Sequence, residues 1–203
     1  MNIITESWKK ETLKHKKLII LSIFFLIIAV IINYVSGNYV DGASCVTVSD
    51  LILDHIPTLD LDFLFVYGIS FVIVVLFLYP IFFKVDRTHI VISQFSLLIL
   101  IRSFFTALTH LSVPAGALSF DSPNFFTIFD FKNALFFSGH TAFPFLGFLL
   151  FRKEKIGKFF LVATIIMALT VLFMHVHYSI DVFAALFITY GSFKIGEWLF
   201  KKL

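Results

Sequence analysis

Long apolar runs alternate with short polar stretches along this chain. Six runs approach the roughly 20 residues that a helix needs to cross the hydrocarbon core of a bilayer. They cover residues 18–36, 62–83, 89–112, 136–151, 157–175 and 178–199. The fourth run is short, and only a tight turn separates the fifth from the sixth. The pattern predicts an all-α integral membrane protein, built as a bundle of six transmembrane helices.

The composition supports this prediction. Of 203 residues, 59% are hydrophobic and only 14% are charged. A soluble domain of this size could not hide so much apolar surface, so most of the chain must have lipid as its solvent. The single cysteine, Cys45, excludes an intramolecular disulfide framework and a metal site built from a cysteine cluster.

Basic residues indicate how the bundle is oriented. They gather before the first run, between the second and third, between the fourth and fifth, and at the C-terminus: Lys9, Lys10, Lys14, Lys16, Lys17, Lys84, Arg87, Arg152, Lys153, Lys155, Lys158, Lys201 and Lys202. The loop 37–61 has no Lys or Arg, and the loop 113–135 has only Lys132 against Asp121 and Asp130. The positive-inside rule therefore predicts both termini in the cytoplasm. We expect residues 1–17 to be a basic interfacial segment on the cytoplasmic side and residues 18–203 to be the membrane domain.

With this orientation, polar groups from separate runs meet at the non-cytoplasmic end. His140 begins the fourth run, and His177 lies in the turn between the fifth and sixth. The outer part of the third run carries His110 and, about two turns deeper, Arg102. Ionisable residues are costly inside a bilayer, so such a group is a functional hypothesis.

The stretch HVHYSID, residues 175–181, has the spacing of an oriented nucleophile. His177 and Asp181 are four residues apart, so on a helix they share a face about 6 Å apart. The carboxylate can accept the proton of one ring nitrogen and leave the other nitrogen free to attack. It would also stabilise the positive charge that the ring gains on attacking phosphorus.

The stretch SGHT, residues 138–141, has the features of an anion site. Ser138 is a good helix N-cap, and the free N–H groups of a helix start bind anions. Gly139 keeps that backbone approachable, and His140 could hand a proton to a leaving oxygen. Together the two stretches predict a site for phosphoryl or phosphodiester transfer.

These motifs resemble the sphingomyelin synthase-like branch of the type 2 phosphatidic acid phosphatase superfamily, whose signatures read S-G-H-T and H-Y-[TS]-x-D-V. Residues 102–114 resemble the arginine-bearing third helix of the family, which ends in a proline turn, and 55–65 weakly resembles its proline-and-aspartate segment. The resemblance covers roughly residues 55–195.

The resemblance implies a catalytic triad of His140, His177 and Asp181 on the extracytoplasmic face, which would be that of the cell membrane if the protein is microbial. In that scheme His177 forms a phosphohistidine with the headgroup of a donor phospholipid, and His140 protonates the departing diacylglycerol. An alcohol acceptor then takes the headgroup, with neither a metal nor another cofactor. No nucleic acid is expected as a partner.

The sequence also departs from the phosphatase branch. The cationic first motif and the Ser-Arg pair before the nucleophilic histidine are absent, since LFMHV precedes His177. A phosphomonoester carries nearly two charges and favours several cations, whereas a phosphodiester carries one. Arg102 is the obvious embedded cation, with Ser138, Gly139, His110 and His175 as further candidates for substrate binding. This inventory favours a diester, hence headgroup transfer.

Other interpretations stay open. Water could be the acceptor, which would make the protein a lipid phosphate phosphatase or a phospholipase C-like hydrolase. The polar cluster could serve a transporter or assembly protein, although a transport path usually needs polar groups through the full depth of the bundle. His140, His175 and His177 could bind a metal if residues 175–177 are not helical. Asp60 and Asp62 are expected to flank the second span.

Overall fold

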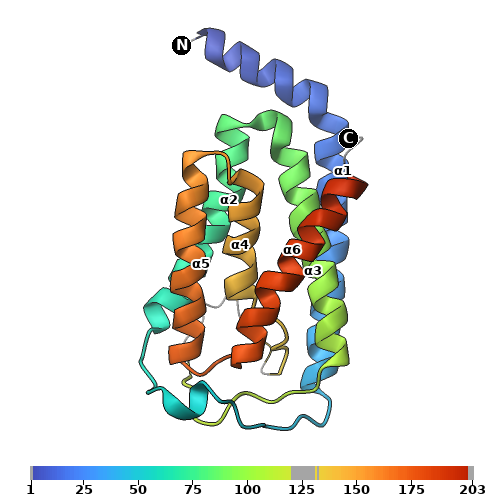
Figure 1. Cartoon of the computed structure of the whole chain (residues 1–203). Coiled ribbons are helices and arrows are strands. Elements are labelled where there is room, and N and C mark those ends of the chain that lie inside the picture. The colour runs from blue at the N-terminus through green and yellow to red at the C-terminus, as the bar shows by residue number, and fades with distance from the viewer. Residues whose placement is uncertain (1, 120–130, 132, 201–203) are drawn as a thin grey trace.

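The computed structural model describes residues 2–119, 131 and 133–200, with side chains from Trp8 onward. Helices make up 75% of the structure, and the described residues contain no strand. The long helices are α1 (Asn2–Asp41), α2 (Ile69–Phe83), α3 (Thr88–Leu108), α4 (Gly139–Phe151), α5 (Lys155–Phe173) and α6 (Ser179–Leu199), arranged as an elongated bundle (Figure 1). Short helical turns cover Leu53–His55, Leu64–Gly68 and Val85–Arg87.

Five helical segments in the described part are long and apolar enough to cross a membrane. They are Trp8–Asp41, Leu64–Phe83, Val85–Leu108, Lys155–Phe173 and Ser179–Leu199. Helix α4 is apolar but has only 13 residues. The prediction of an all-α fold is therefore confirmed for the described residues, and five apolar helices of spanning length indicate a membrane protein, while the helix at the predicted fourth span is shorter.

The outer faces of the long helices are apolar. On α1 the exposed side chains include Ile20, Phe24, Ile27, Ile31 and Val35, which repeat every three or four residues along one face. Exposed Phe, Ile and Leu side chains also lie on α2, α5 and α6. A soluble protein rarely leaves so much contiguous apolar surface in water, so these faces are suited to lipid.

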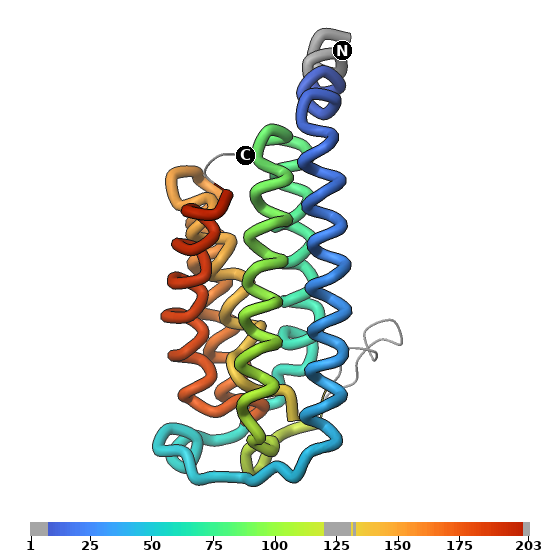
Figure 2. Tube along the Cα trace, turned by 90° about the vertical axis from the view of Figure 1, so that its right-hand side faces the viewer, coloured from blue at the N-terminus to red at the C-terminus, as the bar shows by residue number. Residues whose placement is uncertain are grey.

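Helix α4 supplies much of the packed interior. Its side chains Ala142 and Leu146 are fully buried in the main core, against residues of α3, α5 and α6. A side chain at Gly147 would collide with the ring of Phe160 on α5, so the glycine permits a close approach of these helices. Helices α1 and α3 run side by side along the other part of the bundle (Figure 2).

Some helix boundaries, and the start of the second span, differ in detail from the sequence prediction. Helix α3 ends at Leu108 rather than near 112, because the chain turns extended at Thr109 and pairs with the 37–61 loop through a bridge between Val46 and Leu111. Helix α4 begins at Gly139 rather than at 136. The second span opens with a π-helical turn, Leu64–Gly68, before α2.

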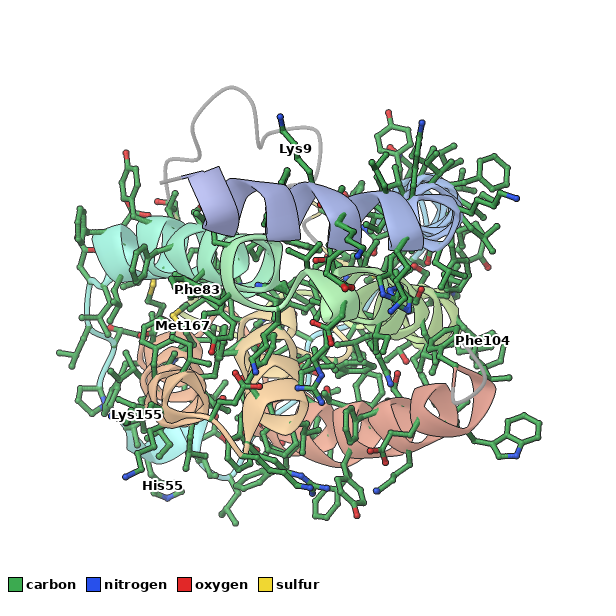
Figure 3. All side chains as sticks on the ribbon, turned by 90° about the horizontal axis from the view of Figure 1, so that it is seen from above. Lys9, His55, Phe83, Phe104, Lys155 and Met167 are labelled. Atoms are coloured by element: carbon green, nitrogen blue, oxygen red, sulfur yellow. The ribbon has the colours of Figure 1, made fainter. Side chains whose placement is uncertain are left out.

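The first turns of α1 lie across the top of the bundle before the helix turns downward (Figures 1 and 3). Trp8 donates a hydrogen bond of 2.8 Å from Nε1 to the carbonyl of Ile81, near the end of α2. Tryptophan with a polar partner is typical of a membrane interface. This geometry accords with an interfacial role for the basic N-terminal segment.

Basic residues lie at this same end of the bundle. Lys84 and Arg87 follow α2, and Arg152 and Lys153 follow α4. The loops 42–63 and 109–119 lie at the opposite end (Figure 1). Five residues of the sequence-based charge argument lie outside the described residues: Asp121, Asp130, Lys132, Lys201 and Lys202.

Candidate functional site

Two histidines from separate segments lie together at the end of the bundle opposite the basic residues. His140 is in the first turn of α4, and His177 is in the turn between α5 and α6. Their ring centroids are 6.4 Å apart, with the ring planes inclined at 59°. The structure therefore brings together two side chains that are 37 residues apart in the sequence.

His177 is held by Asp181. The ring Nδ1 lies 3.4 Å from Oδ2 of this carboxylate, and both side chains are buried. The backbone N–H of Tyr178 donates a hydrogen bond of 3.0 Å to the same oxygen, which fixes the carboxylate at the start of α6. Among the described residues no partner is found for Nε2 of His177, so this nitrogen is the one left for chemistry. The predicted contact of the two side chains is present, but His177 lies in the turn before α6 rather than on the same helix as Asp181.

His140 is fixed by an aromatic neighbour. Its ring stacks on Phe65 at a centroid distance of 4.0 Å and an interplanar angle of 14°. Phe65 belongs to the π-helical turn Leu64–Gly68, and π-helical turns are frequent at functional sites. The stacking limits the rotation of the imidazole ring.

The start of α4 offers unpaired hydroxyls. Ser138 is the N-cap residue as predicted, but its side chain makes no capping hydrogen bond. Ser138 Oγ and Thr141 Oγ1 are buried and have no hydrogen-bond partner among the described residues. Buried polar groups are normally paired, so the two free hydroxyls near His140 are candidates for hydrogen bonds to a polar ligand. Gly139 lies between them, and a side chain there would approach Arg102 Nε to 3.7 Å.

Arg102 binds the backbone just before α4. Nε donates to the carbonyl of Phe137 at 3.0 Å and Nη2 to that of Ala134 at 2.8 Å, while Nη1 lies 3.4 Å from Oδ1 of Asn33. Its charge also interacts with that of Asp181. The guanidinium therefore positions the segment that carries SGHT. Three of its five N–H groups are engaged, so its predicted contact with phosphate stays a prediction.

His110 and His175 lie apart from the pair. The ring of His110 contacts Tyr39 of α1, with centroids 5.7 Å apart. His175 has a left-handed backbone with φ of 54° and lines a separate cavity of about 480 Å³ with Asp50, Asp54 and Tyr178. Their predicted roles in binding substrate stay predictions.

Asp60 and Asp62 lie just before the second span, as expected. Oδ1 of Asp60 accepts a hydrogen bond from the backbone N–H of Asp62.

Asp50 has no assigned role in the sequence-based predictions, yet it ties the 42–63 loop to α6. Its carboxylate accepts hydrogen bonds from the N–H groups of Ile52, Leu53 and Ser179, the last at 2.7 Å. Burial raises the pKa of Asp50, but these hydrogen bonds outweigh that effect and hold the pKa below its usual value. Four aspartates share this loop, and their spacing does not distinguish Asp50 from the others.

Two further residues of the site were also missed. Asn33 is a lone amide within the apolar run of the first span, a signal that could have marked it as a partner of another helix. Phe65 is one of 29 phenylalanines, so no sequence signal separates it from the lipid-facing ones.

The described residues hold no group of three or more His, Cys, Asp or Glu side chains that could bind a metal ion. The alternative metal site at His140, His175 and His177 is therefore not assembled in this part of the chain.

Comparison of the chain with models of known protein families, with curated proteins and with solved structures finds no match.

Proposed function

We propose that this protein is a membrane lipid phosphotransferase that moves a phospho-headgroup from a phospholipid to an alcohol acceptor. The observation that carries the proposal is the meeting of the His140 and His177 rings, with centroids 6.4 Å apart, in front of the buried Asp181. A single phosphate group between these rings can contact both of them.

The reaction would proceed in two displacements. Nε2 of His177 attacks phosphorus, and the bond from phosphorus to the diacylglycerol oxygen breaks as His140 gives that oxygen a proton. In the second step an acceptor hydroxyl gives its proton to His140 and attacks the phosphohistidine, which frees His177. Asp181 holds Nδ1 of His177 and stabilises the positive ring throughout.

The charges near the pair favour a phosphodiester substrate. Arg102 is the cation closest to the site in the described residues, and three of its N–H groups already bind Ala134, Phe137 and Asn33. The remaining N–H groups and the free hydroxyls of Ser138 and Thr141 suit the single charge of a diester better than the nearly double charge of a monoester.

The proposal includes the orientation in the membrane. Six spans, with α4 as the short one and both termini in the cytoplasm, would place the histidines at the extracytoplasmic face. The separation of the basic residues from the histidine pair supports this orientation through the positive-inside rule.

One observation favours a competing function in transport. Thr189 and Ser192 of α6 are buried with hydroxyls that have no partner among the described residues, so polar groups continue from Asp181 toward the basic end. A transport path needs such groups through the depth of the bundle. Transport of an ion or lipid would persist in a His177→Ala protein that inserts normally, whereas lipid turnover would not.

The decisive experiment traps the covalent intermediate. Purified protein is incubated with phospholipids labelled at phosphorus, quenched, and tested for acid-labile label on the chain. We expect label on the wild type and on His55→Ala, a control at an exposed histidine in a different loop at the same end of the bundle, and none on His177→Ala. Equal labelling of His177→Ala would contradict the proposed nucleophile.

A second arm separates transfer from hydrolysis. The same labelled lipid is supplied with and without lipid alcohols other than diacylglycerol as acceptors, because transfer back to diacylglycerol would only regenerate the donor. Label that moves into a new lipid supports the transferase, while label found only in water-soluble products indicates the hydrolase.

A further inference from the structure

We infer that the basic end of the bundle holds a separate binding site for an acidic phospholipid of the adjacent leaflet. The site is a cavity of about 590 Å³ between the start of α3 and the ends of α4 and α6. This volume lies in the range of small-molecule sites in proteins. The site lies at the opposite end of the bundle from His140 and His177, and it does not depend on the proposed reaction.

The rim of the cavity is cationic. Lys84, Arg87, Arg152 and Lys153 all line it, from the ends of three different helical segments. Arg87 is paired with Glu154, whose other oxygen accepts a hydrogen bond from Tyr79. Lys84, Arg152 and Lys153 form no ion pair with any described residue. Three uncompensated cations around one opening favour an anionic group.

The acidic residues of the cavity are already engaged. Glu197 lies 2.6 Å from Lys194 through its Oε2. Glu154 is shared between Arg87 and Tyr79. Both carboxylates have partners and do not neutralise Lys84, Arg152 or Lys153. These three cations can therefore attract an anionic ligand.

The interior of the cavity is mostly apolar, although the buried amide of Gln94 also lines it. Leu149, Phe151 and Phe193 are buried, and Phe200 and Leu150 are half-buried. A cationic rim above an apolar interior matches an amphiphile with a phosphate at the interface and hydrocarbon below it. Basic pockets between spans at a membrane surface recognise acidic lipid headgroups in this way. A free phosphate ion would use only the rim and leave the apolar lining without a partner.

The test uses the full-length chain carrying His177→Ala, so that lipid is not consumed. Protein in neutral detergent micelles is titrated with phosphatidylglycerol, and the readouts are the thermal midpoint and the lipid phosphorus retained after purification. We expect phosphatidylglycerol to be retained and to raise the midpoint, and phosphatidylcholine to do neither. Removing two rim charges with Arg152→Gln and Lys153→Gln should weaken binding roughly thirtyfold.

Two controls separate a built site from general surface charge. Lys155→Gln with Lys158→Gln removes two exposed charges from the same end without touching the cavity, and should leave the affinity nearly unchanged. Leu150→Trp fills the cavity without changing any charge, and should abolish retention of the lipid.

The inference is overturned if the two double variants lose affinity equally, or if inorganic phosphate protects the protein as well as the lipid does. Retention of phosphatidylglycerol by the folded Leu150→Trp protein would overturn it as well.

Discussion

The two ends of this bundle handle polar groups in opposite ways. At the end with the histidines, Asp181 and His177 are buried and bonded to each other, and Arg102 is bound to backbone carbonyls. At the other end, Arg152 and Lys153 are exposed and free of ion pairs with the described residues. Burial makes each polar contact strong and each loss costly, whereas exposed charges are screened and contribute little individually. Substitutions at the two ends should therefore differ in size as well as in kind.

The largest effect is expected for Asp181→Asn. The amide keeps the shape of the side chain but removes the charge that orients and stabilises His177. Lipid turnover should fall on the order of 10³-fold or more, because a neutral partner stabilises the wrong tautomer of the ring. The check is the rate of headgroup release from labelled phospholipid, with insertion verified by yield in the membrane. Full turnover by a properly inserted variant would refute the role given to Asp181.

Arg102→Gln should be the most destabilising of the charge substitutions. It leaves the carbonyls of Ala134 and Phe137 without their donors in a buried site, which should cost about 3 kcal/mol of unfolding free energy.

The matched control is Arg87→Gln. It makes the same Arg-to-Gln change in a partly exposed pair with Glu154, and should lower the unfolding free energy by less than about 1 kcal/mol. Unfolding in detergent would measure both. Equal losses would show that the two ends do not differ in the way described.

Asp50→Asn should produce a smaller effect that depends on pH. The folded pKa of Asp50 is lowered, so its carboxylate stabilises the fold above the unfolded value of 3.8, and this contribution is lost as the pH falls through the folded pKa. At neutral pH the variant should be about 1 kcal/mol less stable than the wild type.

The difference between Asp50→Asn and the wild type should shrink in acid, as measured by unfolding at a series of pH values. Asp54→Asn, an exposed neighbour in the same loop, should not change this pH dependence. A constant difference at every pH would argue against the hydrogen-bonded carboxylate.

The smallest effect is expected for Lys14→Gln, which removes an exposed ion pair 3.9 Å long with Glu11. Such pairs contribute about 0.5 kcal/mol or less, and salt weakens them further. Lipid turnover and the thermal midpoint should both stay near those of the wild type. A large loss would mean that the first turns of α1 support the bundle through contacts of this lysine.

The five helices of spanning length could be predicted from the sequence. A helix that crosses a membrane must be about 20 residues long and mostly apolar, and both properties are visible in the local sequence. The contact of His177 with Asp181 could be predicted from their separation of four residues on a helix, but His177 lies in the turn before α6, and the contact forms because Asp181 is in the first turn of that helix. The partners of Arg102 could not be predicted in this way. They are carbonyl groups, which every residue carries, and only the fold decides which of them face a guanidinium.

The end of α3 shows a second limit. The apolar run continues past Leu108, and hydropathy alone extends the helix to His110 and beyond. Pairing of Leu111 with Val46, from a loop more than sixty residues earlier, ends the helix sooner and directs His110 toward Tyr39. Tertiary contacts of this kind leave no mark in the local pattern, so a site residue at a helix end is placed less reliably than one in its middle.

The shortness of α4 has a consequence for how a lipid would reach the proposed site. Thirteen helical residues span about 20 Å, some 10 Å less than the hydrocarbon core of a bilayer. In the proposed six-span arrangement the non-helical chain before α4 would complete the distance. Its carbonyls at Phe136 and Phe137 accept hydrogen bonds from Thr106 and Arg102, as backbone at membrane depth would require. In the proposed enzyme, a donor lipid would therefore reach the imidazoles by sinking its phosphate below the level of its neighbours, entering sideways from the leaflet rather than being lifted out of it.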